Sequence, residues 1–201
     1  MSGLEERVGG REWRADVLVI GGGPAGTWAA ISAAAQGARV VLADKGYCGA
    51  SGATAPSGTA VWYVEPDAQK REDAKASRYA RGGYLAENDW MDRVLEQTWS
   101  NMQTLADWGY PFPLDSDGQQ QRISLQGPEY MRLMRKRVKQ AGVRILDHSP
   151  ALQLLTDSEG RVSGATGFSR QKNHEWKVEA AAVVIATGGC AFLSRALGCN
   201  V

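Results

Sequence analysis

The chain has 201 residues, of which 43% are apolar and 22% are charged, and its formal net charge is +1. This composition is typical of a folded globular domain. The near-zero charge excludes an electrostatic case for nucleic-acid binding, which needs a concentrated basic face. The basic cluster Arg132, Arg135, Lys136, Arg137 and Lys139 falls on a predicted helix, where we expect a solvated surface.

Residues 1–14 are polar and contain no apolar run long enough for a secretion signal or a membrane span. We interpret them as a disordered tail. The three cysteines, Cys48, Cys190 and Cys199, form no CxxC pair, which argues against a metal site and against a disulfide framework. A reducing, cytoplasmic location is the expectation that fits these thiols.

The apolar run 17–20 leads directly into a glycine cluster, and residues 27–36 form an alanine-rich helical segment. Gly21, Gly23 and Gly26 have the spacing GxGxxG. In this motif the first glycine allows the turn, the second lets a pyrophosphate approach the backbone, and the third lets the helix pack on the strand. The free N–H groups and the dipole at the start of the helix attract phosphate.

A second apolar strand, 39–43, ends at Asp44, which lies 23 positions after Gly21. This is close to the spacing of about 20 at which an acidic side chain accepts a hydrogen bond from a ribose hydroxyl. The strand, helix, strand and acid complete a dinucleotide-binding unit. The alternative, a glycine turn that binds nothing, is disfavoured by this context.

Residues 45–58 are almost all small and follow the carboxyl end of a strand, where ligands of open α/β sheets bind. A flexible linker is the alternative. Helices are predicted at 67–81, 87–108 and 129–141, and together they make a helical insertion at 59–142.

Short strands follow, and three of them are joined by turns too short for parallel crossovers. They therefore predict an antiparallel β-meander. The last strand ends in a second glycine turn, Thr187-Gly188-Gly189, which is delivered to the same edge of the sheet as the first. The predicted strands are 143–146, 151–156, 162–169, 176–180 and 183–186.

This α/β order resembles the Rossmann-like FAD-binding domain of the two-dinucleotide-fold flavoproteins, in which a meander replaces one crossover helix. Within that superfamily the chain most resembles the fumarate reductase and succinate dehydrogenase flavoproteins, a family that also includes L-aspartate oxidase. The segments that carry the resemblance are 16–26, 41–45, 51–58, 105–109, 151–164 and 182–189.

The resemblance implies FAD as the cofactor and a place for each part of it. The pyrophosphate is expected at Gly21, Gly22, Gly23, Pro24, Ala25 and Gly26. The adenosine ribose is expected at Asp44, flanked by Lys45, and the adenine at the backbone of Ala151. The flavin side is expected at Ser51, Gly52, Ala53, Thr54, Ser57 and Gly58, with Thr187 and Gly188 near the ribityl or ribose region.

Two departures from the family matter. Members that attach flavin covalently use a histidine in the loop after the second strand, but this loop contains Ser51-Gly52-Ala53, and the chain's two histidines are His148 and His174. FAD is therefore expected to bind non-covalently. In the family the capping domain that binds substrate follows the second glycine turn, so we expect it to be absent here and the FAD-binding domain to span 15–201.

The predicted function is that of an FAD-dependent oxidoreductase in which hydride moves between a substrate carbon and flavin N5. A small-molecule substrate and an electron-transfer partner subunit are implied, without a membrane span and with the catalytic residues unassigned. The alternatives are a truncated, non-catalytic FAD-binding fragment and an L-aspartate oxidase-like member.

Two rival enzyme classes are disfavoured. A disulfide reductase needs a cysteine pair, but Ala53 stands where the partner of Cys48 would be. A nicotinamide dehydrogenase would continue to alternate helix and strand where this chain has a meander. An acid–base pair of Asp147 and His148 is also disfavoured, because neighbours on a strand point to opposite faces.

Overall fold

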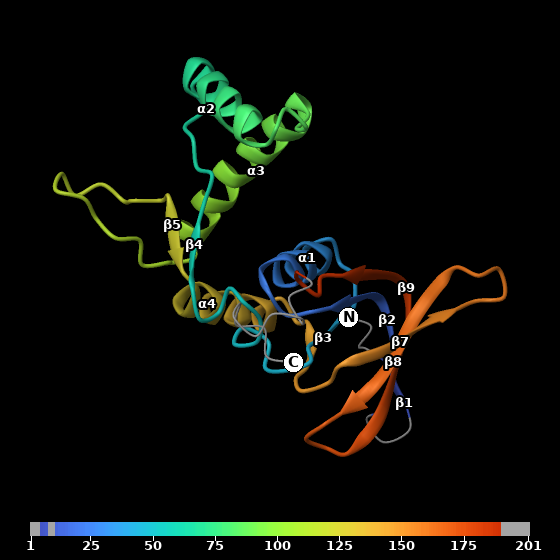
Figure 1. Cartoon of the computed structure of the whole chain (residues 1–201). Helices are drawn as coiled ribbons and strands as arrows, with labels where there is room; N and C mark the ends of the chain where they lie inside the picture. Colours follow the sequence, from blue (N-terminus) through green and yellow to red (C-terminus); the bar gives the residue numbers. More distant parts are fainter. Residues whose placement is uncertain (1–4, 8–10, 190–201) are drawn as a thin grey trace. The chain divides into compact units, whose positions relative to one another are not determined.

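The computed structural model describes residues 5–7 and 11–189, so Cys190 and Cys199 lie outside the described residues. The chain divides into two compact units. The first unit combines residues up to 57 with those from 127 onward, and the second comprises Gly58–Gln126. The colours of Figure 1 follow the chain through both units.

A single mixed sheet forms the centre of the first unit. Its strand order is β6-β3-β2-β9-β8-β7, and β1 pairs with β2. Strands β6, β3, β2 and β9 are parallel to one another, whereas β7, β8 and β9 are antiparallel neighbours. The predicted parallel sheet with a β-meander is confirmed. The strands are β1 (Glu5–Arg7), β2 (Glu12–Ile20), β3 (Val40–Ala43), β6 (Arg144–Leu146), β7 (Ala151–Thr156), β8 (Val162–Ser169) and β9 (His174–Ile185).

Two sequence predictions for this sheet are wrong. The tail predicted at 1–14 is contradicted because β2 begins at Glu12 and β1 pairs with it. The two strands predicted at 176–180 and 183–186 are one strand, β9, which pairs with β2 from Glu12↔Lys177 to Ile20↔Ile185. Pairing along both strands overrides the weak strand propensity of the alanines in the middle of β9.

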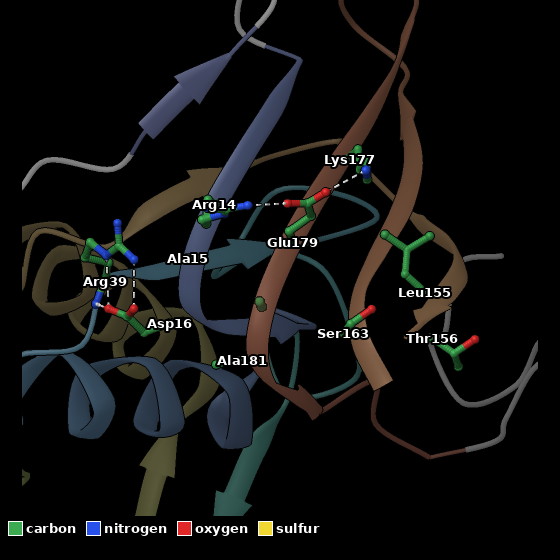
Figure 2. A pocket seen from close by; sticks show the side chains of 11 residues that line it. Arg14, Ala15, Asp16, Arg39, Leu155, Thr156, Ser163, Lys177, Glu179 and Ala181 are labelled. Carbon is green, nitrogen blue, oxygen red and sulfur yellow. Dashed lines mark hydrogen bonds and ion pairs between the residues drawn. The ribbon is translucent and has the colours of Figure 1, made fainter. Parts of the chain in front are cut away.

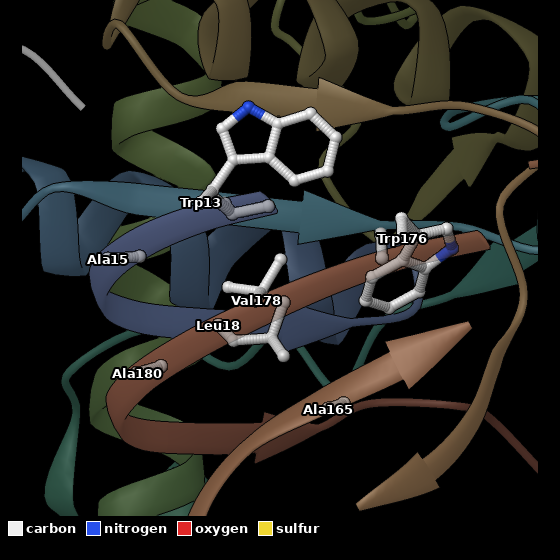
Figure 3. Packing of buried hydrophobic residues seen from close by; sticks show 9 residues of the cluster. Trp13, Ala15, Leu18, Ala165, Trp176, Val178 and Ala180 are labelled. Atoms are coloured by element: carbon white, nitrogen blue, oxygen red, sulfur yellow. The ribbon is translucent and has the colours of Figure 1, made fainter. Parts of the chain in front are cut away.

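The sheet has a hydrophobic cluster on each side. Figure 3 shows the first cluster, in which Trp13 and Trp176 lie close to Leu18, Val178 and the small side chains of neighbouring strands. The opposite cluster joins strands β2 and β3 to two helices, and its members are Val19, Ala30, Val40, Leu42, Cys48, Val138 and Val143. Burial on both faces explains the continuous apolar run of β3.

The helices on that second face are α1 (Pro24–Ala35) and α4 (Gly127–Gln140). They are joined by a hydrogen bond of 2.8 Å from Trp28 Nε1 to Tyr130 Oη. Because α4 packs on the first unit, the helical insertion ends at Gln126 and not at residue 142 as predicted.

The second unit contains α2 (Ala68–Arg81) and α3 (Asn88–Asp107), which confirm the two predicted helices, and a small sheet of β4 (Gly58–Ala60) and β5 (Ser124–Gln126). Asp67 caps α2 by accepting a hydrogen bond from Lys70 N. Lys75 on α2 pairs with Asp92 on α3 at 2.8 Å. The sequence did not predict β4 and β5, because three residues are too few for a period-2 pattern.

Candidate cofactor site

Two glycines of the first turn are required by the packing of the turn itself. Gly21 has φ +108°, and a Cβ there would overlap the carbonyl oxygen of Ala186. A Cβ on Gly26 would overlap the carbonyl oxygen of Gly21. These positions therefore fix how closely α1 approaches β2 and the end of β9, which is the role the motif predicts for its first and third glycines.

Gly23 differs from both of them. Its φ is −77°, and a Cβ built there would meet no atom of the described part of the chain within 4 Å. Gly23 is also the N-cap residue of α1, which has no side-chain capping hydrogen bond. Among the residues that the structure describes, no neighbouring atom requires a glycine here, and the start of the helix supplies backbone N–H groups, which suit a phosphate ligand.

The carboxylate of Asp44 points to this turn. Asp44 is buried, and its Oδ2 accepts a hydrogen bond of 2.6 Å from Gly22 N. Its Oδ1 accepts hydrogen bonds from Gly46 N at 2.7 Å and from Ser51 Oγ at 2.5 Å. A carboxylate offers about four lone-pair positions, so one acceptor position remains on Oδ2.

Cys48 is fully buried beside the same turn. Its Sγ lies 3.7 Å from the carbonyl oxygen of Gly22. Burial, together with the negative charge of Asp44, raises the pKa of the Cys48 thiol to about 12. The thiol is therefore protonated at neutral pH, and because the thiolate is the reactive form, Cys48 is unsuited to a thiol relay.

The small-residue loop continues from Ser51 to Ser57 with mostly exposed or half-buried side chains, Ala55 being buried. Ser57 Oγ donates to Ala53 O at 2.7 Å. The loop packs against the start of α4. Gly127 N donates a hydrogen bond of 2.7 Å to Ser57 O. A Cβ on Gly127 would overlap the carbonyl oxygens of Thr54 and Ser57. Gly58, which was predicted with this loop, begins β4 in the second unit.

The second glycine turn does reach the same edge of the sheet as the first. Ala186 N donates to Ile20 O at 2.8 Å, and Ala186 lies against Gly21. Thr187 and Gly188 follow with exposed positions, and Gly188 has φ +81°. Among the other predicted residues, Lys45 is exposed and Ala151 opens β7 half-buried.

Asp147 pairs with an arginine, Arg135 of α4, at 2.6 Å. The side chain of Arg135 is 13% exposed, so the prediction of a solvated basic face is wrong for this residue. Nothing in the sequence distinguishes Arg135 from its basic neighbours. His148 adopts φ +51° in a turn and its backbone N donates to Gly46 O, while His174 is half-buried at the start of β9.

A cavity of about 550 Å³ lies away from both glycine turns, over the first half of β2 and the middle of β9. Figure 2 shows its charged side chains facing one another. Glu179 pairs with Arg14 at 3.3 Å and with Lys177 at 2.7 Å, and Asp16 pairs with Arg39 at 2.9 Å. Because each charge drawn there has an opposite partner, this cavity is a weaker candidate than the turns.

Within the described residues, no helix combines the length and the apolar character that a membrane crossing requires. The carboxyl edge of β2, β3 and β9 is the best candidate for a ligand site. It combines an open helix start, a buried carboxylate and two glycine turns.

Comparison with known proteins assigns the family. Residues 16–127 and 116–199 match the model of the family described as FAD binding domain. L-aspartate oxidase of Streptomyces coelicolor is 29% identical over 87% of this chain and 33% of its own length. A fumarate reductase (cytochrome) of Shewanella frigidimarina is 27% identical over 88% of this chain and 33% of its own length.

Among solved structures, E. coli quinol fumarate reductase superimposes with a TM-score of 0.77 and 26% identity, over 90% of this chain and 34% of that chain. This chain thus spans about a third of the length of these relatives. The family model covers most of the chain, and the sheet, the meander and both turns agree with it. The chain belongs to the FAD binding domain family.

Proposed function

We propose that this chain is the FAD-binding part of an FAD-dependent oxidoreductase similar to the fumarate reductase and succinate dehydrogenase flavoproteins. The observation that carries the proposal is the contrast between Gly23, whose Cβ position is open, and Gly21 and Gly26, whose Cβ positions are filled by backbone. A glycine for which the described residues give no steric reason, placed at a helix start without a side-chain cap, fits close approach of a phosphate.

The backbone N–H groups at the start of α1 would hold the pyrophosphate, next to Gly22, Gly23, Pro24 and Ala25. The free acceptor position of Asp44 would bind one ribose hydroxyl, with Lys45 at the rim and Ala151 toward the adenine. The flavin side would lie along Ser51, Gly52, Ala53, Thr54, Ser57 and Gly58, near Thr187 and Gly188. Bound FAD would supply hydride exchange between a substrate carbon and its N5 atom.

The loop from Ser51 to Ser57 contains no histidine, which supports non-covalent binding. For the whole protein we propose a small-molecule substrate and an electron-transfer partner, because relatives are named as quinol and cytochrome fumarate reductases. The buried, protonated thiol of Cys48 fits a reducing cytoplasm.

The test is an equilibrium titration of the purified chain with FAD, followed by flavin fluorescence, with ADP and FMN as competitors. We expect FAD to bind reversibly, ADP to displace it, and FMN to displace it far less, because ADP carries the diphosphate, ribose and adenine. Absence of FAD binding, or displacement by FMN but not by ADP, contradicts the proposal.

A further inference from the structure

Arg135 and Asp147 form a largely enclosed ion pair near the proposed site. Arg135 Nη2 lies 2.6 Å from Asp147 Oδ2, and Arg135 Nη1 lies 2.8 Å from Asp147 Oδ1, so the pair is bidentate. Their side chains are 13% and 22% exposed. The hydrogen bond and charge of Asp147 raise the pKa of Arg135, so the guanidinium is charged at neutral pH.

This pair holds both ends of one residue in the loop after β3. Cys48 N donates to Asp147 Oδ1 at 2.8 Å, and Arg135 Nη1 donates to Cys48 O at 2.9 Å. The guanidinium also lies 3.7 Å from the centroid of the Tyr47 ring. The N–H and C=O of Cys48 are therefore both bound by charged groups, which make stronger hydrogen bonds than neutral ones.

Close packing adds to these bonds. Gly49 has φ +90°, and a Cβ there would lie 2.9 Å from Met131 O and 3.2 Å from Arg135 Cβ. The backbone of the loop thus rests directly on α4.

On its other side Cys48 touches the first turn. A Cβ on Gly22 would lie 2.8 Å from Cys48 Sγ and 2.6 Å from Asp44 Oδ2. The ion pair, the Cys48 peptide, and the contact of Gly22 with Cys48 and Asp44 therefore form one continuous set of contacts from α4 to the turn.

We propose that Arg135 and Asp147 are positioning residues for FAD: they fix the loop from Gly46 to Gly49 so that Asp44 and Gly22 keep the geometry that receives the ribose and the pyrophosphate. This inference rests on the proposed function. Neither side chain needs to contact the cofactor, because each acts through the Cys48 peptide.

The first experiment measures the Kd for FAD of the full chain carrying Arg135→Met or Asp147→Asn. We expect each variant to bind FAD roughly tenfold more weakly, the effect of losing a charged hydrogen bond at the loop. Arg135→Lys keeps the charge but not the bidentate fork, so its Kd should lie between those of wild type and Arg135→Met.

Arg132→Met is the matched control. Arg132 lies on the same helix and pairs with Glu129 at 2.7 Å, but its side chain is 72% exposed. We expect its Kd to stay within about twofold of wild type, because exposed ion pairs contribute little. An equal loss in Arg132→Met and Arg135→Met overturns the proposal.

The second experiment separates positioning from general destabilisation by combining Arg135→Met with Asp44→Asn. If Arg135 acts through the placement of Asp44, its effect on the Kd should largely disappear in the Asp44→Asn background. Fully additive losses, or a wild-type Kd in both Arg135→Met and Asp147→Asn, overturn the positioning role. A wild-type chain that does not bind FAD instead contradicts the proposed function.

Discussion

The loop that follows β3 has two halves that differ in composition and in how they are held: residues 44–49 include charged and aromatic side chains, whereas residues 52–57 are small and uncharged. Residues 44–49 are held by side chains: the Asp44 carboxylate accepts three hydrogen bonds, and the Arg135–Asp147 pair binds the Cys48 peptide. Residues 52–57 are held by the backbone contacts of Gly127 and by two local hydrogen bonds, from Ser57 Oγ to Ala53 O and from Ser57 N to Thr54 O. One loop thus contains a segment held by side-chain hydrogen bonds and a more exposed segment of small residues.

This difference indicates which half of the proposed site should contribute most of the free energy of FAD binding. A preorganised segment pays less ordering entropy when a ligand binds. The segment proposed for the nucleotide half of FAD is preorganised by the chain itself, whereas the segment proposed for the flavin half is exposed. We therefore expect FAD affinity to depend mainly on the nucleotide half, and the predictions below test that asymmetry.

The largest effect is expected from Gly23→Val. Its side chain would enter open space with an ordinary φ, so the apo protein should keep its melting temperature while FAD binding is lost. Gly26→Val, in contrast, would collide with Gly21 and should cost about 3 kcal/mol of stability. Thermal melts and FAD titrations of both variants check this, and normal FAD binding by Gly23→Val would contradict the phosphate assignment.

Asp44→Asn should weaken FAD binding by about 10- to 100-fold, because a charged acceptor at the ribose is lost, worth about 1.5–3 kcal/mol. FMN binding, where measurable, should change much less. The ratio of the Kd for FAD to the Kd for FMN, measured for Asp44→Asn and for wild type, checks that the lost affinity comes from contacts with the nucleotide half. Equal losses for FAD and FMN would show that Asp44 acts on the whole loop.

Two serines of the proposed flavin side provide a matched pair, because only one of them is bonded to the nucleotide half. Ser51 Oγ donates to Asp44 Oδ1 at 2.5 Å, whereas Ser57 Oγ donates to Ala53 O at an exposed position. We expect Ser51→Ala to weaken FAD binding by roughly fivefold and Ser57→Ala by less than about twofold. Fluorescence titrations of each variant with FAD measure these changes in Kd. A larger loss of affinity in Ser57→Ala than in Ser51→Ala would contradict the expectation that the nucleotide half dominates FAD binding.

The smallest effect is expected from Asp16→Asn, which lies outside both halves. Hydrogen bonds from Arg39 lower the pKa of Asp16 from 3.8 to about 2. The unfolded chain therefore binds the proton at higher pH than the folded chain, so the pair stabilises the fold above pH 3.8 and loses this effect as the pH falls toward 2. Urea melts should show Asp16→Asn less stable than wild type at neutral pH, a difference that shrinks over that interval, with FAD affinity unchanged.

Much of the fold could be predicted because its signals are local. The apolar run 17–20, the glycine motif and the turns of the meander each depend on neighbouring residues, and β7 and β8 have the predicted bounds. The start of β2 was missed, although Trp13 and Ala15 are buried and alternate with Glu12 and Arg14, because four residues give little periodicity. The predicted break in β9 reflected the low strand propensity of alanine, which pairing overrides.

The family, the cofactor class and the position of the first turn could be identified from local sequence, because glycine spacing and an acid at a fixed distance are read along the chain. The tertiary fold was needed to show that backbone atoms fill the Cβ positions of Gly21 and Gly26 and leave that of Gly23 open among the described residues. It also decided that Arg135, one of several basic residues on a helix, binds a peptide 87 positions away. Such roles depend on contacts between segments remote in sequence, and no local pattern specifies them.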